Sequence, residues 1–185
     1  FVPYVHSYDF TRPELDCAIL FGDGHWPGAH AHHITGNEVA LIAPRTKVAD
    51  WPIHTPRDVA RYTLLRHVTV PEAWLRWSET HGVEGLIDPL AGPQFDQFQT
   101  MIRAVMAGMG LALVPRCLVQ DEITAGLVRE PLPDADLRGG YRSDVGYWFC
   151  YPEGRTQLHA LQCFREWLLA CAEPMGAQAP VSPPA

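Results

Sequence analysis

The sequence has 185 residues, of which 47% are hydrophobic and 19% are charged, as is typical of a folded globular protein. It carries 14 basic and 21 acidic side chains for a formal net charge of −7, and its arginines are scattered along the chain. A nucleic-acid surface needs clustered Lys and Arg, so this chain is not expected to contact DNA itself. There is neither an export signal nor an apolar run of about 18 residues, so no membrane contact and a cytoplasmic location are expected.

The cysteines are odd in number and contain no C-x-x-C pair. They are Cys17, Cys117, Cys150, Cys163 and Cys171. This usage favours free, buried thiols in a reducing compartment. Cys17 and Cys150 lie in apolar runs and are expected in the core.

The first predicted elements are strands separated by a loop. Residues 15–21 form a short apolar run that is typical of a strand buried on both faces. Residues 22–36 contain too many glycines for a helix and are expected to be a loop. Residues 39–43 read as a second strand, which Pro44 ends.

Helix signals and a further strand follow. Thr55 suits an N-cap and Pro56 the first position of a short helix. Leu64 and Leu65 then indicate a buried strand. Residues 71–80 predict a helix, with Gly82 as its stop.

The strongest helical pattern comes directly after Asp96. Its apolar residues recur every three or four positions: Phe98, Met101, Ile102, Val105 and Met106. A buried strand over 111–115, a helix over 117–125 and a short strand over 127–130 are predicted next.

The last elements are an aromatic strand over 147–151 and a helix over 157–170. Strands and helices therefore alternate, which predicts an α/β fold with mostly parallel sheets and ligand sites at the carboxyl ends of strands.

Several segments form an ordered series along the chain. They are Leu15–Gly28 (LDCAILFGDGHWPG), Thr55–Arg61 with Leu64-Leu65, Gly92–Asp96 (GPQFD), Ala104–Pro115 (AVMAGMGLALVP), Tyr147-Trp148 and Phe164–Leu169 (FREWLL). Each piece alone is common. Together, in this order from about Asp9 to Ala172, they resemble the effector-binding domain of LysR-type transcriptional regulators, especially the branch of the glycine-cleavage activator and the β-lactamase regulator.

This resemblance implies a two-lobed, periplasmic-binding-protein-like (type 2) fold with two crossover strands. The implied division is an incomplete lobe I at residues 1–43 and 150–173, lobe II at 44–149, and a disordered Pro/Ala-rich tail at 174–185. The crossovers, near 39–44 and 147–152, would form the hinge.

A complete relative would also carry a winged helix-turn-helix, a linker helix, and the first strand and helix of lobe I before Phe1. We therefore take the chain to be an amino-terminally truncated fragment that reaches DNA only through the missing domain. The resemblance further implies homodimers or homotetramers with antiparallel pairing, in which the helix over 157–170 is the expected lobe I contact.

Loops at strand ends are expected to line a small-molecule effector site. The candidate residues are Gly22, His25, Trp26, His67, Phe95, Asp96, Gln97 and Phe98. Arg66 lies beside them. Free backbone N–H groups at the helix start favour an anionic effector, although Asp96 equally suits a cap of that helix. Relatives often have Ser or Thr where this chain has Phe98, which predicts a less polar pocket.

Metal binding and catalysis are not supported by these residues. His25, His30, His32 and His33 crowd together, but no nearby Cys or acidic side chain completes a ligand set, so solvated loop histidines are favoured. There is no G-x-S-x-G motif, and the apolar runs around the cysteines would raise their pKa. We expect no metal, no cofactor and no catalytic residue, and so not an enzyme.

The sequence thus predicts a domain that binds a metabolite between two lobes without converting it, and thereby biases the DNA-binding heads of a regulator. The alternative is an exported solute-binding protein of the same fold, which a secretion signal in the full gene would support.

Overall fold

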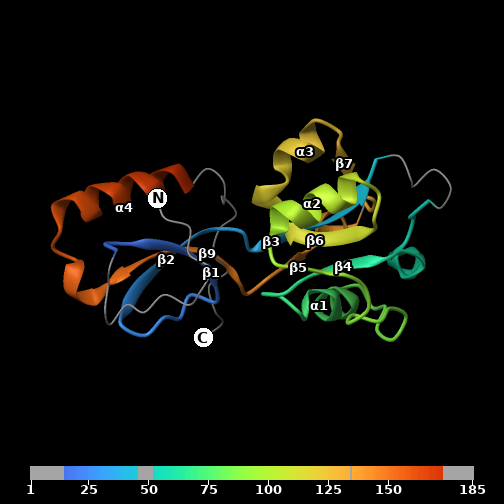
Figure 1. The fold of residues 1–185 in the computed structure, drawn as a ribbon, viewed down its shortest axis with the longest axis horizontal. Helices are drawn as coiled ribbons and strands as arrows, with labels where there is room; N and C mark the ends of the chain where they lie inside the picture. Colours follow the sequence, from blue (N-terminus) through green and yellow to red (C-terminus); the bar gives the residue numbers. More distant parts are fainter. Residues whose placement is uncertain (1–14, 46–51, 134, 173–185) are drawn as a thin grey trace, which may run out of the picture. The chain divides into compact units, whose positions relative to one another are not determined.

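The chain folds into two compact units in the computed structural model, which describes residues 15–45, 52–133 and 135–172 (Figure 1). Unit 1 comprises the described residues up to Thr35 and from Asp144 onward, and unit 2 comprises those from Gly36 to Ser143. These limits differ from the expected lobe boundaries at 43/44 and 149/150. As a result, the whole of strand β3 belongs to unit 2 and the whole of strand β9 to unit 1.

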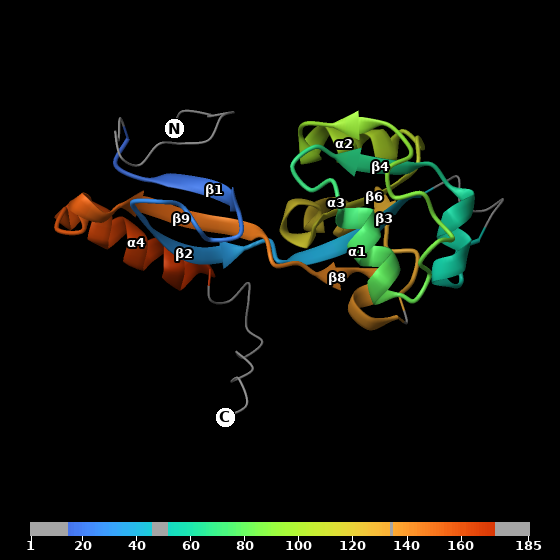
Figure 2. The same cartoon turned by 90° about the horizontal axis from the view of Figure 1, so that it is seen from below.

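Unit 1 contains a three-stranded sheet in the order β1-β9-β2. The strands are β1 (Ala18–Gly22), β2 (Ala29–Thr35) and β9 (Gly146–Pro152), and the turn η4 (Glu153–Arg155) leads to helix α4 (His159–Ala172). Helix α4 lies along one face of this sheet (Figure 2). Phe149 and Tyr151, two positions apart on β9, point to the same face and pack with Leu161 of α4.

Unit 2 contains a six-stranded sheet in the order β5-β4-β6-β3-β7, with β8 also paired to β3. Its strands are β3 (Glu38–Pro44), β4 (Leu64–His67), β5 (Gln94–Phe95), β6 (Leu111–Pro115), β7 (Val128–Arg129) and β8 (Tyr141–Arg142). Its helices and turns are η1 (Pro56–Arg61), α1 (Ala73–Thr80), α2 (Phe98–Met106), η2 (Arg116–Leu118), α3 (Gln120–Thr124) and η3 (Asp136–Gly139).

Helices cover both faces of this sheet, which explains why β3 is apolar throughout (Figure 1). Alternate residues of β3, such as Leu41, pack with Trp74 and Trp77 of α1. The intervening Ile42 is also fully buried, and α2 contacts β3. A strand covered on both faces shows a continuous apolar run and no alternation.

The expectation of mostly parallel sheets is wrong for the described strands. Only the β4–β5 and β4–β6 pairings are parallel, and every other pairing in the described part is antiparallel. The chain passes from unit 1 to unit 2 through β2 and β3, and it returns through β8 and β9. The outgoing and returning strands pair antiparallel, β2 with β9 and β3 with β8. In addition, the expected loop over 22–36 contains β2, and β1 is only half-buried because it is an edge strand.

The cysteines are free but not uniformly buried. Cys150 is buried and Cys17 and Cys117 are half-buried, whereas Cys163 and Cys171 are exposed on α4. The expectation of buried thiols is wrong for these last two, because an apolar stretch on a helix covered on one side also presents residues to solvent. None of the described helices is of a length and hydropathy suited to crossing a bilayer.

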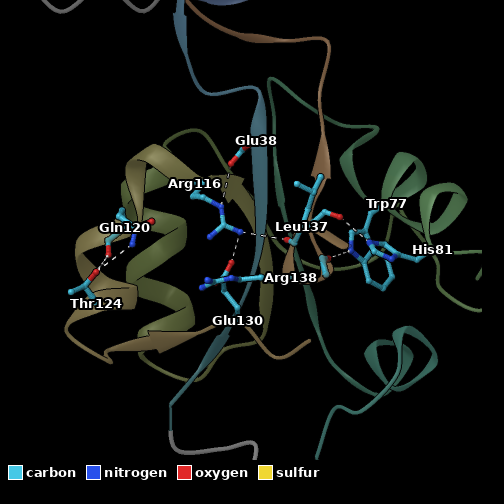
Figure 3. A network of polar contacts seen from close by, with 11 residues as sticks. Glu38, Trp77, His81, Arg116, Gln120, Thr124, Glu130, Leu137 and Arg138 are labelled. Atoms are coloured by element: carbon cyan, nitrogen blue, oxygen red, sulfur yellow. Dashed lines mark hydrogen bonds and ion pairs between the residues drawn. The ribbon is translucent and has the colours of Figure 1, made fainter. Parts of the chain in front are cut away.

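The segment around η3 is tied to unit 2 by several polar contacts (Figure 3). Leu137 and Arg138 both have positive φ, at 49° and 52°, a conformation that costs non-glycine residues about 1–2 kcal/mol each. Trp77 donates a hydrogen bond from Nε1 to the Gly139 carbonyl at 2.7 Å, and the His81 ring lies 2.9 Å from the Gly140 carbonyl. These contacts hold the strained segment against α1.

Candidate functional site

The ends of β4 and β5 and the start of α2 bring five of the predicted residues together in unit 2. Strands β4 and β5 pair in parallel, with His67 opposite Phe95, and the Val68 N–H donates to the Phe95 carbonyl at 2.9 Å. Gly92 makes this close approach possible, since it has φ +95° and a Cβ there would lie 2.1 Å from the Leu64 carbonyl oxygen.

His67 and Phe98 form the centre of this group. Their rings stack with centroids 3.8 Å apart and an interplanar angle of 12°. His67 is 5% exposed and Phe98 is 8% exposed. The Thr69 N–H donates to Nδ1 of His67, which leaves the proton of the neutral ring on Nε2. Nε2 is buried and makes no hydrogen bond of normal geometry within the described residues.

Burial lowers the pKa of His67, and this effect outweighs the opposing influence of the Asp96 carboxylate and backbone. The neutral ring is therefore the resting form near pH 7. A neutral, buried N–H donor beside an aromatic face can recognise an acceptor on a planar or apolar ligand.

Asp96 and Gln97 lie exposed at the start of α2. The N-cap is Gln97, with no side-chain cap bond, so the role of Asp96 as the helix cap is not observed. Asp96 is not the cap because α2 begins at Phe98, so the residue directly before the helix is Gln97. Gln97 contributes no side-chain hydrogen bond to the first turn of α2.

The predicted unit 1 residues share the turn between β1 and β2. The Trp26 ring packs against Gly22, where a Cβ would lie 2.9 Å from it. His25 is exposed, and its backbone N–H donates to the Asp23 carboxylate at 3.0 Å.

Trp148 also shapes this turn, and the sequence reasoning did not include it among the site residues. Its Nε1 donates to the Gly22 carbonyl at 2.9 Å, and a Cβ on Gly24 would lie 2.8 Å from its ring. Antiparallel pairing of β1 with β9 places Trp148 there, opposite Leu20. The sequence shows a tryptophan at this position, but it does not show the direction in which β9 pairs with β1. Thr69, which orients His67, was missed as well.

Of the four clustered histidines, only His25 lies in a loop. His30, His32 and His33 are on β2, so His33 points to the face opposite that of the other two. Within the described residues, no group of three or more His, Cys, Asp or Glu side chains is arranged to hold a metal ion.

A family model for the LysR substrate binding domain matches residues 9–172. This chain belongs to the LysR substrate-binding domain family. The glycine cleavage system transcriptional activator of Escherichia coli K12 is 28% identical over 165 residues, which cover 89% of this chain and 52% of that protein. The transcriptional activator AmpR of Rhodobacter capsulatus is 32% identical over 162 residues, covering 86% of this chain and 52% of AmpR.

The solved structures agree with this assignment. The effector domain of AmpR from Pseudomonas aeruginosa superposes with a TM-score of 0.77 at 26% identity, covering 93% of this chain and 79% of that one. The periplasmic-binding-protein-like α/β class of LysR effector domains is thereby confirmed for this chain. This chain spans about half the length of the curated relatives it matches. These relatives are transcriptional regulators, so the exported solute-binding alternative is not favoured.

Acidification is expected to destabilise this LysR domain partly through His67. Because burial holds the folded-state pKa of His67 below its ordinary value, the unfolded chain takes up the proton first as the pH falls below about 6.5. Stability contributed by neutral His67 is therefore lost toward acid, by at most about 1.4 kcal/mol per pH unit. Urea unfolding at pH 7.5 and 5.5 measures this loss.

Two variants separate the contribution of His67 from that of other groups. His67→Gln should flatten the change in unfolding free energy with pH. Asp96→Asn should steepen it, because Asp96 partly offsets the lowering of the His67 pKa. An identical slope in the wild type and both variants would contradict the assignment.

Proposed function

We propose that this chain is the effector-binding part of a LysR-type transcriptional regulator and that it binds a small metabolite without converting it. The family match carries the proposal. The stacked rings of His67, at the carboxyl end of β4, and Phe98, at the start of α2, support the location of the effector site. The proposed effector contacts are Gly22, His25 and Trp26 in unit 1, and His67, Phe95, Asp96, Gln97 and Phe98 in unit 2.

The chemistry of these residues favours an effector with an anionic group and an apolar body. The side chain of Gln97 does not cap α2, and the partial positive charge at a helix start attracts a carboxylate. Phe98 supplies an apolar surface at the position where relatives often have the more polar Ser or Thr. The exposed Asp96 opposes a purely anionic ligand, so amino acids, which also carry a positive group, come first in a screen.

The remaining parts of the regulator are proposed from the relatives. Several are named HTH-type transcriptional activators, and this chain covers about half of their length. We infer that DNA is contacted only through a winged helix-turn-helix outside this chain, in the cytoplasm, by a homodimer or homotetramer. Effector binding would change how the DNA-binding heads are presented, and no cofactor would take part.

A ligand screen tests the proposal. Thermal-shift measurements with amino acids, aromatic acids and peptidoglycan fragments should identify a stabilising compound, and calorimetry should give its Kd. Phe98→Ser, His67→Gln and Trp26→Ala should each weaken binding about tenfold or more, since each removes a contact worth about 1.4 kcal/mol. Asp121→Asn, an exposed change on α3, serves as the control.

The fate of the ligand distinguishes binding from turnover. Mass spectrometry after prolonged incubation should recover it unchanged. Conversion of the compound, or full affinity in all three site variants, would refute the proposed function.

A further inference from the structure

Three side chains from three elements of unit 1 meet at one hydroxyl group. Nε2 of His32 on β2 lies 3.1 Å from the hydroxyl oxygen of Tyr151 on β9. Nη1 of Arg165 on α4 donates to the same oxygen at 3.1 Å. The His32 ring also stacks over the Tyr151 ring, with centroids 5.6 Å apart and an interplanar angle of 14°. None of these residues belongs to the proposed effector contacts.

The hydrogen-bond donors in this cluster favour a neutral His32 ring. A guanidinium has only donors, so the Tyr151 hydroxyl accepts from Arg165, and its own proton is available for donation to Nε2 of a neutral His32 ring. The pKa of His32 is lowered, first by burial, then by Arg165 and by His30, which favours the neutral ring that can accept this proton.

Within the described part of the chain, the charged or titratable groups that act on His32 are basic. Facing it are Tyr151 from β9, Arg165 from α4 and His30 from β2, whose ring lies 5.3 Å from that of Tyr151. Among the described residues, no carboxylate pairs with Arg165. Tyr151 is only 3% exposed, His32 and Arg165 are half-buried, and His30 is open to solvent. The cluster thus carries positive charge, is partly shielded from solvent, and includes the solvent-exposed His30.

We propose that Arg165, His32 and His30 form a binding site for a small oxyanion on unit 1, and that anion binding is coupled to protonation of His32. When His32 takes up a proton from solvent, Nε2 becomes a donor and no longer accepts from Tyr151. Two cations then face one hydroxyl, an arrangement that an oxyanion relieves by accepting from both. Charge-assisted hydrogen bonds of this kind are among the stronger ones in proteins.

Sulfate is the appropriate probe because it remains a dianion between pH 5 and 8, so any pH dependence belongs to the protein. At constant ionic strength, replacing chloride by sulfate should raise the melting temperature of the chain, and more at pH 5.5 than at 7.5. If one proton is taken up with the anion, the affinity should increase by up to about tenfold per pH unit. NMR of the His32 ring should show its pKa rise in sulfate.

Variants identify the site. Arg165→Gln should weaken sulfate binding about tenfold or more, because it removes a charged hydrogen-bond donor. His32→Gln should remove most of the pH dependence, since His30 remains as the one other imidazole of the proposed site. Arg103→Gln makes the same charge change on an exposed position of α2 in unit 2 and should leave binding unchanged.

The outcomes are distinct. A smaller effect of acetate than of sulfate would indicate a preference for tetrahedral oxyanions, and an equal effect would extend the site to carboxylates. Equal melting temperatures in sulfate and chloride at both pH values would overturn the proposal. So would an unchanged sulfate response in Arg165→Gln with an unchanged His32 titration in the wild type. Neither result depends on the effector.

Discussion

Replacing Trp77 with alanine is expected to lower the free energy of unfolding of unit 2 by about 3–5 kcal/mol. Trp77 is fully buried and packs against Trp74 with ring centroids 5.6 Å apart and an interplanar angle of 73°. Truncation leaves a cavity in the core next to α1. It also leaves the Gly139 carbonyl without its donor, in the segment where Leu137 and Arg138 have positive φ.

A second variant separates packing from hydrogen bonding. Trp77→Phe keeps an aromatic ring but removes the Nε1 donor, so it should cost about 1–3 kcal/mol through the unpaired carbonyl and the lost volume. Leu75→Ala on the same helix, at a position 41% exposed, should change stability by less than about 1 kcal/mol. Urea unfolding followed by far-UV circular dichroism measures all three. A Trp77→Ala protein as stable as Leu75→Ala would contradict this account.

Patterns within one element were predictable from the sequence. The apolar spacing after Asp96 gave the helix that the structure has at Phe98–Met106, and the Thr55-Pro56 signal marked the start of η1. At that start, the Asp58 carboxylate accepts from the Thr55 backbone N–H at 3.0 Å. These signals are local, because they depend only on helix periodicity and on end groups.

Properties that depend on pairing between distant strands were not predictable. Strand β2 lies in a glycine-flanked stretch and is defined by its pairing with β9, more than 100 residues later. The direction of β9 likewise placed Trp148 over Gly22 and Tyr151 beside His32. The stacking of His67 on Phe98 required the β4–β5 register, which no periodicity reveals.

Neutralising Glu130 is expected to be the most damaging single charge change in unit 2. Its side chain is 5% exposed and forms ion pairs with Arg116 and with Arg138, the latter at 3.2 Å (Figure 3). Removing one partner of a buried pair is costly because it leaves the other charge poorly compensated. Arg138 is largely exposed and Arg116 keeps Glu38 at 3.7 Å, so we expect Glu130→Gln to cost roughly 2–4 kcal/mol, at or below the range for fully buried pairs.

Glu38→Gln is the matched control, since it makes the same change in the same network at a side chain 43% exposed. Glu38 contacts Arg116 and Arg142 at 3.7 and 3.8 Å, and exposed pairs of this kind contribute about 0–1 kcal/mol. Urea unfolding at low and high salt should show a small, salt-sensitive loss for Glu38→Gln and a larger, salt-insensitive loss for Glu130→Gln. Equal losses would mean that burial does not set the strength of the network. In that case Arg116, which also donates to the Leu137 carbonyl at 3.4 Å, would hold the strained segment without help from Glu130.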